Sequence, residues 1–391
     1  MTRILIVTLL ESFAGILVQR GIFFYTKEHL SFGKVDNLWL ALATGAPYVL
    51  GALASHPLSR RLGERRLLLL LLVGQILSLI PIVMLPKGQS LSIAIFICGA
   101  VFSTLIGVKW PLVESYVGAG HEPSRQFRAV GVFNITWSGA VPLALGAAGL
   151  LIWAAPWALF VAALAVFAIN LIPTLGLPAV PVHLPDDHPQ RPDAATLTRY
   201  RSLLTASRAL LVSSYCLMWI LAAVLPDILI ESLGISLLLA PALAALPDLM
   251  RLGMFILLTA RTRWHGRVWP LVVAAAAMPV GFLAIMSSLG LMTVLAGEAV
   301  FGLAIGMVYY AALYYALASK NASVEAGGAH EALIGSGFIF GPTACLIGIY
   351  LSSGGSMSML TGTVTGVGPL ILATTALAVW PLLRLRRSSN Q

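Results

Sequence analysis

The chain has 391 residues, of which 59% are hydrophobic and only 10% are charged, and its mean hydropathy is +0.92. This composition excludes an ordinary soluble domain, because about a quarter of the residues in such domains are charged. The formal net charge is +9, but the basic residues form short clusters between apolar runs, which argues against a nucleic-acid partner. We therefore predict an all-α integral membrane protein embedded in a lipid bilayer.

The apolar runs predict about twelve transmembrane helices, each near the roughly 20 residues that a bilayer core requires. None of the runs shows the period-2 alternation of a membrane β-barrel. The first run begins like a signal peptide, but it has no small-residue cleavage site and is long enough to span. In chain order, the predicted spans are 4–25, 36–55, 67–86, 92–114, 129–151, 155–172, 204–230, 235–259, 268–289, 291–318, 332–352 and 364–383.

The distribution of lysine and arginine predicts the orientation of these spans. With the N-terminus in the cytoplasm, the arginine clusters at 60–66 and 261–267 lie inside, and Lys27, Lys34 and Lys87 lie outside. Loops rich in lysine and arginine favour the cytoplasmic side of a membrane. We therefore expect both termini in the cytoplasm and a location in the plasma membrane, which in a bacterium is the inner membrane.

A proline-rich segment divides the chain into two halves that resemble each other. At an offset of 200 residues, Pro47 corresponds to Pro247, and Pro142 corresponds to Pro342. Matches in one register favour an internal repeat of two six-helix units. The predicted units are an N-terminal six-helix bundle at 1–172, a cytoplasmic linker at 173–203 and a C-terminal six-helix bundle at 204–391.

The loop between the second and third spans carries a recognisable pattern, HPLSRRLGER, at residues 56–65. Major facilitator superfamily transporters have G-x-L-(small)-D-(R/K)-x-G-(R/K)-(R/K) in this loop. The residues that match this pattern are Leu58, Ser59, Arg61, Gly63 and Arg65, whereas His56, Arg60 and Glu64 depart from it. A degraded counterpart, TARTRWHGR, occupies the equivalent place in the second half. The chain therefore resembles the major facilitator superfamily.

This resemblance implies two pseudo-symmetric six-helix bundles and spans 1, 4, 7 and 10 around a central cavity. It implies a gating role for Arg61, Gly63 and Arg65, but none for Arg60, which replaces the aspartate of the motif. The alternative is that the arginine cluster only sets topology. We expect Gly63→Leu to impair function by blocking close approach of the loop, and Arg60→Ala to be tolerated.

Ionisable residues inside the spans are candidates for proton coupling, because a charge at the bilayer centre costs at least about 2.5 kcal/mol. Glu11 lies near the middle of the first span and is the main candidate. The resemblance implies that Lys109 of the fourth span lies near it, so that a proton on Glu11 would weaken their attraction. The further candidates are Asp248, Arg251 and Glu298. Asp248 and Arg251 are three residues apart on one helix, so a purely structural ion pair is the alternative interpretation.

Polar and aromatic residues in the spans predict contacts with a substrate. Lys109 is suited to an anionic group, and tryptophan and tyrosine rings offer flat faces with polar atoms. The candidates for substrate binding are Lys109, Trp110, Asn134, Trp137, Tyr309 and Tyr310. Packing or interfacial anchoring is the alternative role for the tyrosines.

Metal and cofactor sites are not expected. The segment HEALI at 330–334 lacks the second histidine of a zinc-binding helix. The three cysteines are odd in number and have no metal-binding spacing. An intramembrane enzyme would need clustered carboxylates for metal or acid–base chemistry, and the sequence shows no such cluster.

The sequence thus predicts a monomeric secondary transporter that moves a small organic solute by alternating access, coupled to protons as a symporter or antiporter. Two alternatives remain: an efflux transporter for drugs or other hydrophobic compounds, and a membrane receptor or scaffold that does not transport.

Overall fold

A computed structural model describes residues 1–119, 123–181, 193–320, 324–352 and 359–388. The described residues form helices and connecting turns, and contain no β-strand. Twelve helical segments among them are long and apolar enough to cross a membrane. The prediction of an all-α membrane protein with about twelve spans is therefore confirmed.

The described residues of the first half form seven helices, because the first span is interrupted at Arg20. These helices are α1 (Thr2–Gln19), α2 (Gly21–Leu30), α3 (Lys34–Leu62), α4 (Glu64–Met84), α5 (Gln89–Gly118), α6 (Pro123–Ala154) and α7 (Ala158–Leu175).

The second half of the chain has breaks in two of its spans. The seventh span ends in a π-helical turn, and the eighth begins with a separate short helix. The elements are α8 (Ala194–Pro226), η1 (Asp227–Ser232), α9 (Ala240–Leu243), α10 (Leu246–Ala260), α11 (Trp269–Ser287), α12 (Leu291–Lys320), α13 (Val324–Ser352) and α14 (Met359–Ser388).

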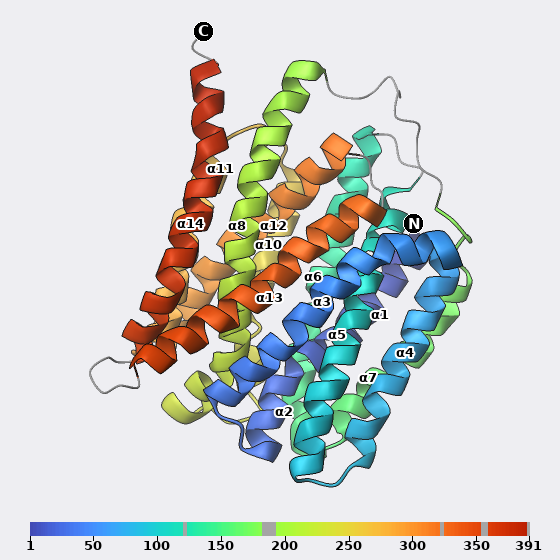
Figure 1. Cartoon of the computed structure of the whole chain (residues 1–391), viewed down its shortest axis with the longest axis vertical. Helices are drawn as coiled ribbons and strands as arrows, with labels where there is room; N and C mark the ends of the chain where they lie inside the picture. The colour runs from blue at the N-terminus through green and yellow to red at the C-terminus, as the bar shows by residue number, and fades with distance from the viewer. Residues whose placement is uncertain (120–122, 182–192, 321–323, 353–358, 389–391) are drawn as a thin grey trace.

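The helices pack as two groups that follow the two halves of the chain (Figure 1). In the first group α1 contacts α6 and α7, α3 contacts α5, and α4 contacts α5 and α7. In the second group α8 contacts α12, α13 and α14, while α10 and α11 contact α12. The groups meet mainly where α3 and α5 pack on α13, and where α6 packs on α10.

The two ends of the helix bundle differ in what they carry. The N-terminus, the beginning of α8 and the end of α14 lie at one end, which we call the linker face (Figure 1). Arg3 lies there and donates a hydrogen bond to the carbonyl of Gly176, just after α7, at 2.5 Å. Helix α2 and the turn η1 lie at the opposite end, the far face. That the linker face is cytoplasmic remains a prediction.

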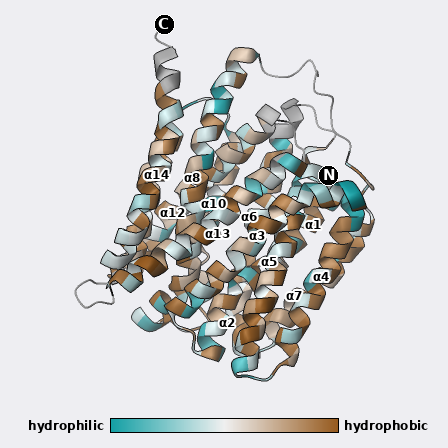
Figure 2. Ribbon diagram, viewed as in Figure 1, coloured by the Kyte–Doolittle hydropathy of each residue, from teal (hydrophilic) through white to brown (hydrophobic). Residues whose placement is uncertain are grey.

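The outer surface is apolar, as a surface in contact with lipid must be. Figure 2 shows hydrophobic residues along α4, α7 and α14, and hydrophilic residues near the N-terminus where α3 meets α4. The large exposed apolar side chains include Leu50, Leu70, Leu77, Ile97, Leu143 and Trp153.

Glycines allow the helices to pack closely in both halves. A Cβ on Gly107 of α5 would lie 2.3 Å from the carbonyl oxygen of Tyr48 in α3. A Cβ on Gly302 of α12 would likewise lie 2.3 Å from the carbonyl oxygen of Pro247 in α10. Since lipid is as apolar as a leucine side chain, helices in membranes associate largely through such close backbone contact.

Several helices extend beyond the predicted spans. Helix α8 begins at Ala194, inside the predicted linker at 173–203. Asp193 caps it, because its carboxylate accepts a hydrogen bond from the backbone nitrogen of Thr196 at 2.7 Å. This hydrogen bond favours the ionised carboxylate and lowers the pKa of Asp193. The apolar run alone underestimates the length of such a helix, because its first turns lie outside the hydrophobic core of the bilayer.

Candidate functional site

A central cavity lies between the two helix groups, with about 730 Å³ of empty space that includes its opening to solvent. Helices α1, α5, α8 and α12 contribute to its wall, as the resemblance implied, and α3, α6, α10 and α13 contribute as well. Its lining includes Glu11, Ser12, Gln19, Arg20, Tyr48, Trp110, Trp137, Tyr215, Met218, Trp219, Arg251, Tyr309, Glu331 and Phe338.

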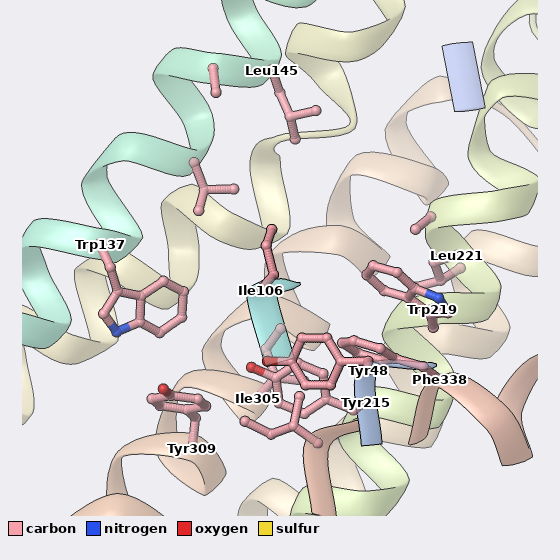
Figure 3. Packing of buried hydrophobic residues seen from close by; sticks show 14 of the residues in the cluster. Tyr48, Ile106, Trp137, Leu145, Tyr215, Trp219, Leu221, Ile305, Tyr309 and Phe338 are labelled. Atoms are coloured by element: carbon pink, nitrogen blue, oxygen red, sulfur yellow. The ribbon is translucent and has the colours of Figure 1, made fainter. Parts of the chain in front are cut away.

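Aromatic rings from both halves form much of the cavity wall (Figure 3). Trp137 of α6 meets Tyr309 of α12 edge to face, with ring centroids 5.0 Å apart. Trp219 of α8 stacks on Phe338 of α13 at 4.0 Å. The guanidinium of Arg251 lies over the Trp137 ring, 4.5 Å from its centroid. Such a wall presents flat apolar faces together with a positive charge.

Two arginines share one carboxylate at the edge of the cavity. Asp248 accepts a hydrogen bond from Arg251 at 2.5 Å on the same helix, and it also pairs with Arg20 from the first half. Asp248 is fully buried, and both arginines reach the cavity. The predicted pair of Asp248 and Arg251 is therefore part of a three-residue cluster that joins the two halves.

Glu11 belongs to a buried polar network inside the first half. Its carboxylate pairs with the ammonium of Lys109 at 2.7 Å and accepts a hydrogen bond from Gln75 at 2.8 Å. Lys109 also donates to Gln75, and the Asn170 side chain lies 3.4 Å from Glu11. Glu11 reaches the cavity, whereas Lys109 lies behind it and is not among the lining residues of the described chain.

The other predicted substrate residues divide into two groups. Trp110, Trp137 and Tyr309 line the cavity. Asn134 is buried behind the wall, where its oxygen accepts a hydrogen bond from the Trp137 indole at 3.0 Å. Tyr310 points elsewhere: it lies 3.1 Å from the Thr259 hydroxyl and packs against Trp264. The structure therefore does not bring Tyr310 and Lys109 to the cavity.

Charged residues also join the halves at the far face. Lys27 of α2 pairs with Asp227 of η1 at 2.5 Å and with Glu231.

Glu298 of α12 is fully buried near Arg20 and Asp248, yet its carboxylate oxygens have no hydrogen-bond partner among the described residues. An unpaired buried carboxylate is uncommon, which keeps Glu298 among the candidates for titration.

Comparison with known proteins decides the family. A family model described as Major Facilitator Superfamily matches residues 4–342. The chain belongs to the major facilitator superfamily. It is therefore an integral membrane protein of a transporter family, which favours transport of a small molecule over enzymatic catalysis.

Two solved structures illustrate the shared superfamily fold. The nucleoside transporter NupG is similar with a TM-score of 0.66 at 12% sequence identity, over 98% of each chain. The human organic anion transporter MFSD10 (TETRAN) is similar with a TM-score of 0.65 at 16% identity, over 96% of this chain and 98% of that chain. No curated protein sequence matches the chain. At these identities the likeness shows the fold alone.

The superfamily motif forms the turn between α3 and α4. Gly63 ends α3 with φ of 77°, a backbone conformation that favours glycine. Arg65 donates to the carbonyl of Leu177 at 3.1 Å, which ties this turn to the segment after α7. Arg60 and Arg61 are exposed. A Cβ on Gly63 meets nothing within 4 Å, so close approach was the wrong reason for a glycine here.

The degraded motif of the second half forms the turn between α10 and α11. Arg199 donates to the carbonyl of Gly266 at 2.7 Å, and the Tyr315 hydroxyl accepts from the Gly266 nitrogen at 3.0 Å. His265 stacks on Tyr314 with ring centroids 4.4 Å apart. Burial lowers the pKa of His265 to about 4, because the charged imidazolium is poorly solvated there.

Sequence reasoning missed several lining residues. Tyr48, Tyr215, Trp219 and Phe338 form part of the wall, but a single aromatic residue in an apolar helix gives no sign of which face it occupies. Gln75 had a usable signal, because it is a polar amide inside the otherwise apolar helix α4.

Proposed function

We propose that the protein is a secondary transporter that moves a small, polar, ring-bearing organic solute by alternating access, driven by protons. One observation carries this proposal: a cavity between the two halves that combines aromatic walls with the charged side chains of Glu11, Arg20 and Arg251. Membership of the superfamily supplies the rocking of one half against the other around such a site.

The wall chemistry supports the solute class. Edge-to-face and stacked rings at Trp137, Tyr309, Trp219 and Phe338 offer apolar surface for a planar ring. The guanidinium groups of the arginines offer hydrogen-bond donors for its polar substituents. A nucleoside transporter and an organic anion transporter share the fold; a nucleoside carries a planar base with polar substituents, and an organic anion carries a negative charge that a guanidinium can bind.

The Glu11 network supports proton coupling. Its ammonium, amide and carboxylate groups are removed from water, so a proton on Glu11 weakens the attraction to Lys109 across 2.7 Å. Because Glu11 also lines the cavity, its protonation changes the charge that a solute meets. A single proton thereby biases the equilibrium between the two orientations of the carrier.

Ligand-induced stabilisation of the purified protein tests the solute class, because a bound solute raises the melting temperature. We would screen nucleosides, aromatic organic anions and hydrophobic drugs in detergent, and then measure uptake of each hit into proteoliposomes. We expect hits among the nucleosides or aromatic anions. Hits only among hydrophobic drugs favour the efflux alternative, and binding without transport favours the receptor alternative.

A pair of tryptophans on α6 provides the matched control. Trp137 lines the cavity, whereas Trp153 is 72% exposed on the outer surface. We expect Trp137→Ala to weaken binding of the identified solute at least about tenfold, since aromatic contacts in desolvated pockets dominate binding energy. Trp153→Ala should bind like the wild type. Equal binding by the two variants would exclude this cavity as the solute site.

A further inference from the structure

A second polar cluster lies beside the cavity toward the linker face, where the halves meet. Glu114 comes from the last turns of α5, and His330 and Glu331 come from the first turns of α13. Their relative exposures are 6%, 1% and 3%, respectively. One ligand atom from each residue lies within 4.8 Å of the others. The cluster therefore brings three metal-binding side chains together in a site removed from water.

Two of these side chains have unsatisfied polar atoms. Both carboxylate oxygens of Glu114 and both ring nitrogens of His330 have no hydrogen-bond partner among the described residues. Glu331 faces Glu114, and the two carboxyls hydrogen-bond to each other only while one of them holds a proton; when both are ionised, neither satisfies the other. Each buried polar atom left unpaired costs about 1–3 kcal/mol. The centre of the cluster therefore favours a group that accepts electron pairs.

We propose that Glu114, His330 and Glu331 bind a divalent first-row transition-metal cation such as Zn²⁺, Mn²⁺ or Co²⁺. A ligand set of imidazole and carboxylate suits these metals, whereas Mg²⁺ and Ca²⁺ prefer oxygen ligands alone. The two negative charges of the carboxylates balance the charge of the cation. Ligand atoms about 2.2 Å from one tetrahedral cation lie about 3.5 Å apart, so a pair at the 4.8 Å limit would close by about 1 Å on binding.

Neighbouring residues hold the ligands in orientation. The Tyr48 hydroxyl of α3 donates to Oε2 of Glu331, and the Tyr309 ring packs edge to face on His330 with centroids 5.5 Å apart. Such contacts around a metal site fix the ligand geometry and raise affinity. Glu331 also lines the central cavity, which supplies an entry path for the cation.

The cation would join the two halves, because its ligands come from both of them. The beginning of α13 lies directly against Glu114: a Cβ on Gly327 would be 2.8 Å from its Oε2. A bound cation thus stabilises the conformation in which the halves are together on this side of the cavity. This inference goes beyond the proposed function and does not depend on proton coupling.

Metal titration of the full-length protein tests the proposal. The protein would be purified through a tag without histidine, and Zn²⁺ binding would be measured by calorimetry and Co²⁺ binding by absorption. We expect one cation per chain, with Mg²⁺ unable to compete. Glu114→Gln and His330→Asn should each weaken binding at least about tenfold. Glu298→Gln is the matched control, since it removes a buried carboxylate that lies on α12.

Thermal unfolding provides a second readout that does not require transport. Zn²⁺ should raise the melting temperature of the wild type and Glu298→Gln, but not that of Glu114→Gln. If Glu114→Gln does not fold, the melting temperature of His330→Asn with and without Zn²⁺ is compared with that of the wild type instead. Three results would overturn the proposal: no saturable binding to the wild type, binding by both ligand variants that equals binding by the wild type, or full competition by Mg²⁺. None of these results depends on whether the protein transports a solute.

Discussion

Glu11 and Lys109 show how a buried charge pair can be both a structural unit and a coupling device. Their side chains are almost fully buried, and Gln75 bonds to both of them. Removing one partner of such a pair costs about 3–5 kcal/mol, because the other charge is left uncompensated. Glu11 is therefore best tested with its partner present and with its partner removed.

We predict that Glu11→Gln still exchanges the identified solute across proteoliposomes but no longer accumulates it under a pH gradient. The amide imitates the protonated carboxyl and keeps its volume, so the solute site survives while the proton site is lost. The measurement compares solute exchange by counterflow with uptake driven by a pH gradient. Glu28→Gln, which alters an exposed carboxylate on α2, should accumulate like the wild type.

A double variant separates coupling from folding in this test. Glu11→Gln with Lys109→Met removes both charges, so no uncompensated ion is left in the apolar interior. It should be more stable to heat than Glu11→Gln alone and equally unable to accumulate solute. Undiminished gradient-driven accumulation in either variant would exclude Glu11 as the coupling residue.

The individual site residues were only partly predictable from the sequence. Glu11 stood out because a carboxylate inside an apolar span is costly, and the structure places it at the cavity. The same argument selected Lys109 for an anionic substrate, and the resemblance also implied that Lys109 lies near Glu11; the structure pairs the two charges at 2.7 Å. The free-energy cost of burying a charge indicates which charged residues are important, but it does not indicate which residues they pair with.

At the scale of elements, the turn between α3 and α4 carries the superfamily motif and a clear backbone constraint. Gly63 has φ of 77° and ψ of 146°, a region that L-residues with a side chain rarely occupy. Holding another residue in such a region costs about 1–3 kcal/mol. The constraint is therefore conformational, because the space around Gly63 is open.

We predict that Gly63→Leu lowers the melting temperature in detergent and reduces solute uptake several-fold. Arg60→Ala, three residues earlier on the exposed end of α3, should change uptake by no more than a few-fold. Both proteins would be compared at equal amounts of inserted protein. A severe loss in Arg60→Ala with normal insertion would assign a gating role to Arg60 in place of the missing aspartate.

The helices themselves follow from the sequence because each apolar run is long enough to span a membrane. Their ends do not follow, since turns outside the hydrophobic core contain polar residues. Helix α5 continues to Gly118, past the predicted end at 114, and α14 continues to Ser388, past 383. Breaks at Arg20 and at Asp227–Ser232 also escape a hydropathy argument, because they lie within otherwise apolar segments.

At the scale of the whole molecule, the orientation in the membrane remains to be measured. Arg61, Arg199 and Arg263 are exposed and belong to turns or helix ends at the linker face, whereas Lys87 is exposed in the turn between α4 and α5. The positive-inside rule assigns the linker face to the cytoplasm. All native cysteines are buried, which gives a low background for thiol labelling.

We predict that single cysteines at Arg61, Arg199 and Arg263 react with an impermeant maleimide only after the cytoplasmic side is exposed. A cysteine at Lys87 should react in intact cells. Labelling of the cysteine at position 61 in intact cells would contradict the predicted orientation, and labelling at both 61 and 87 from one side would contradict the span count between them.

The sequence by itself determined the membrane location, the number and order of the spans, and the family. These properties depend on the length of apolar runs and on a motif in one loop, both of which are local along the chain. Only the tertiary structure decided which polar groups meet. Glu114 and Glu331 belong to different halves, and Arg20 reaches Asp248 across the interface between them.

The physical reason lies in how membrane helices associate. Hydrophobicity directs every span into the bilayer but does not distinguish one partner helix from another, because lipid and leucine are equally apolar. The choice of neighbours depends on where glycines permit close backbone contact, as Gly107 does toward Tyr48. Polar side chains then meet according to the rotation and depth of each helix, which no single apolar run encodes.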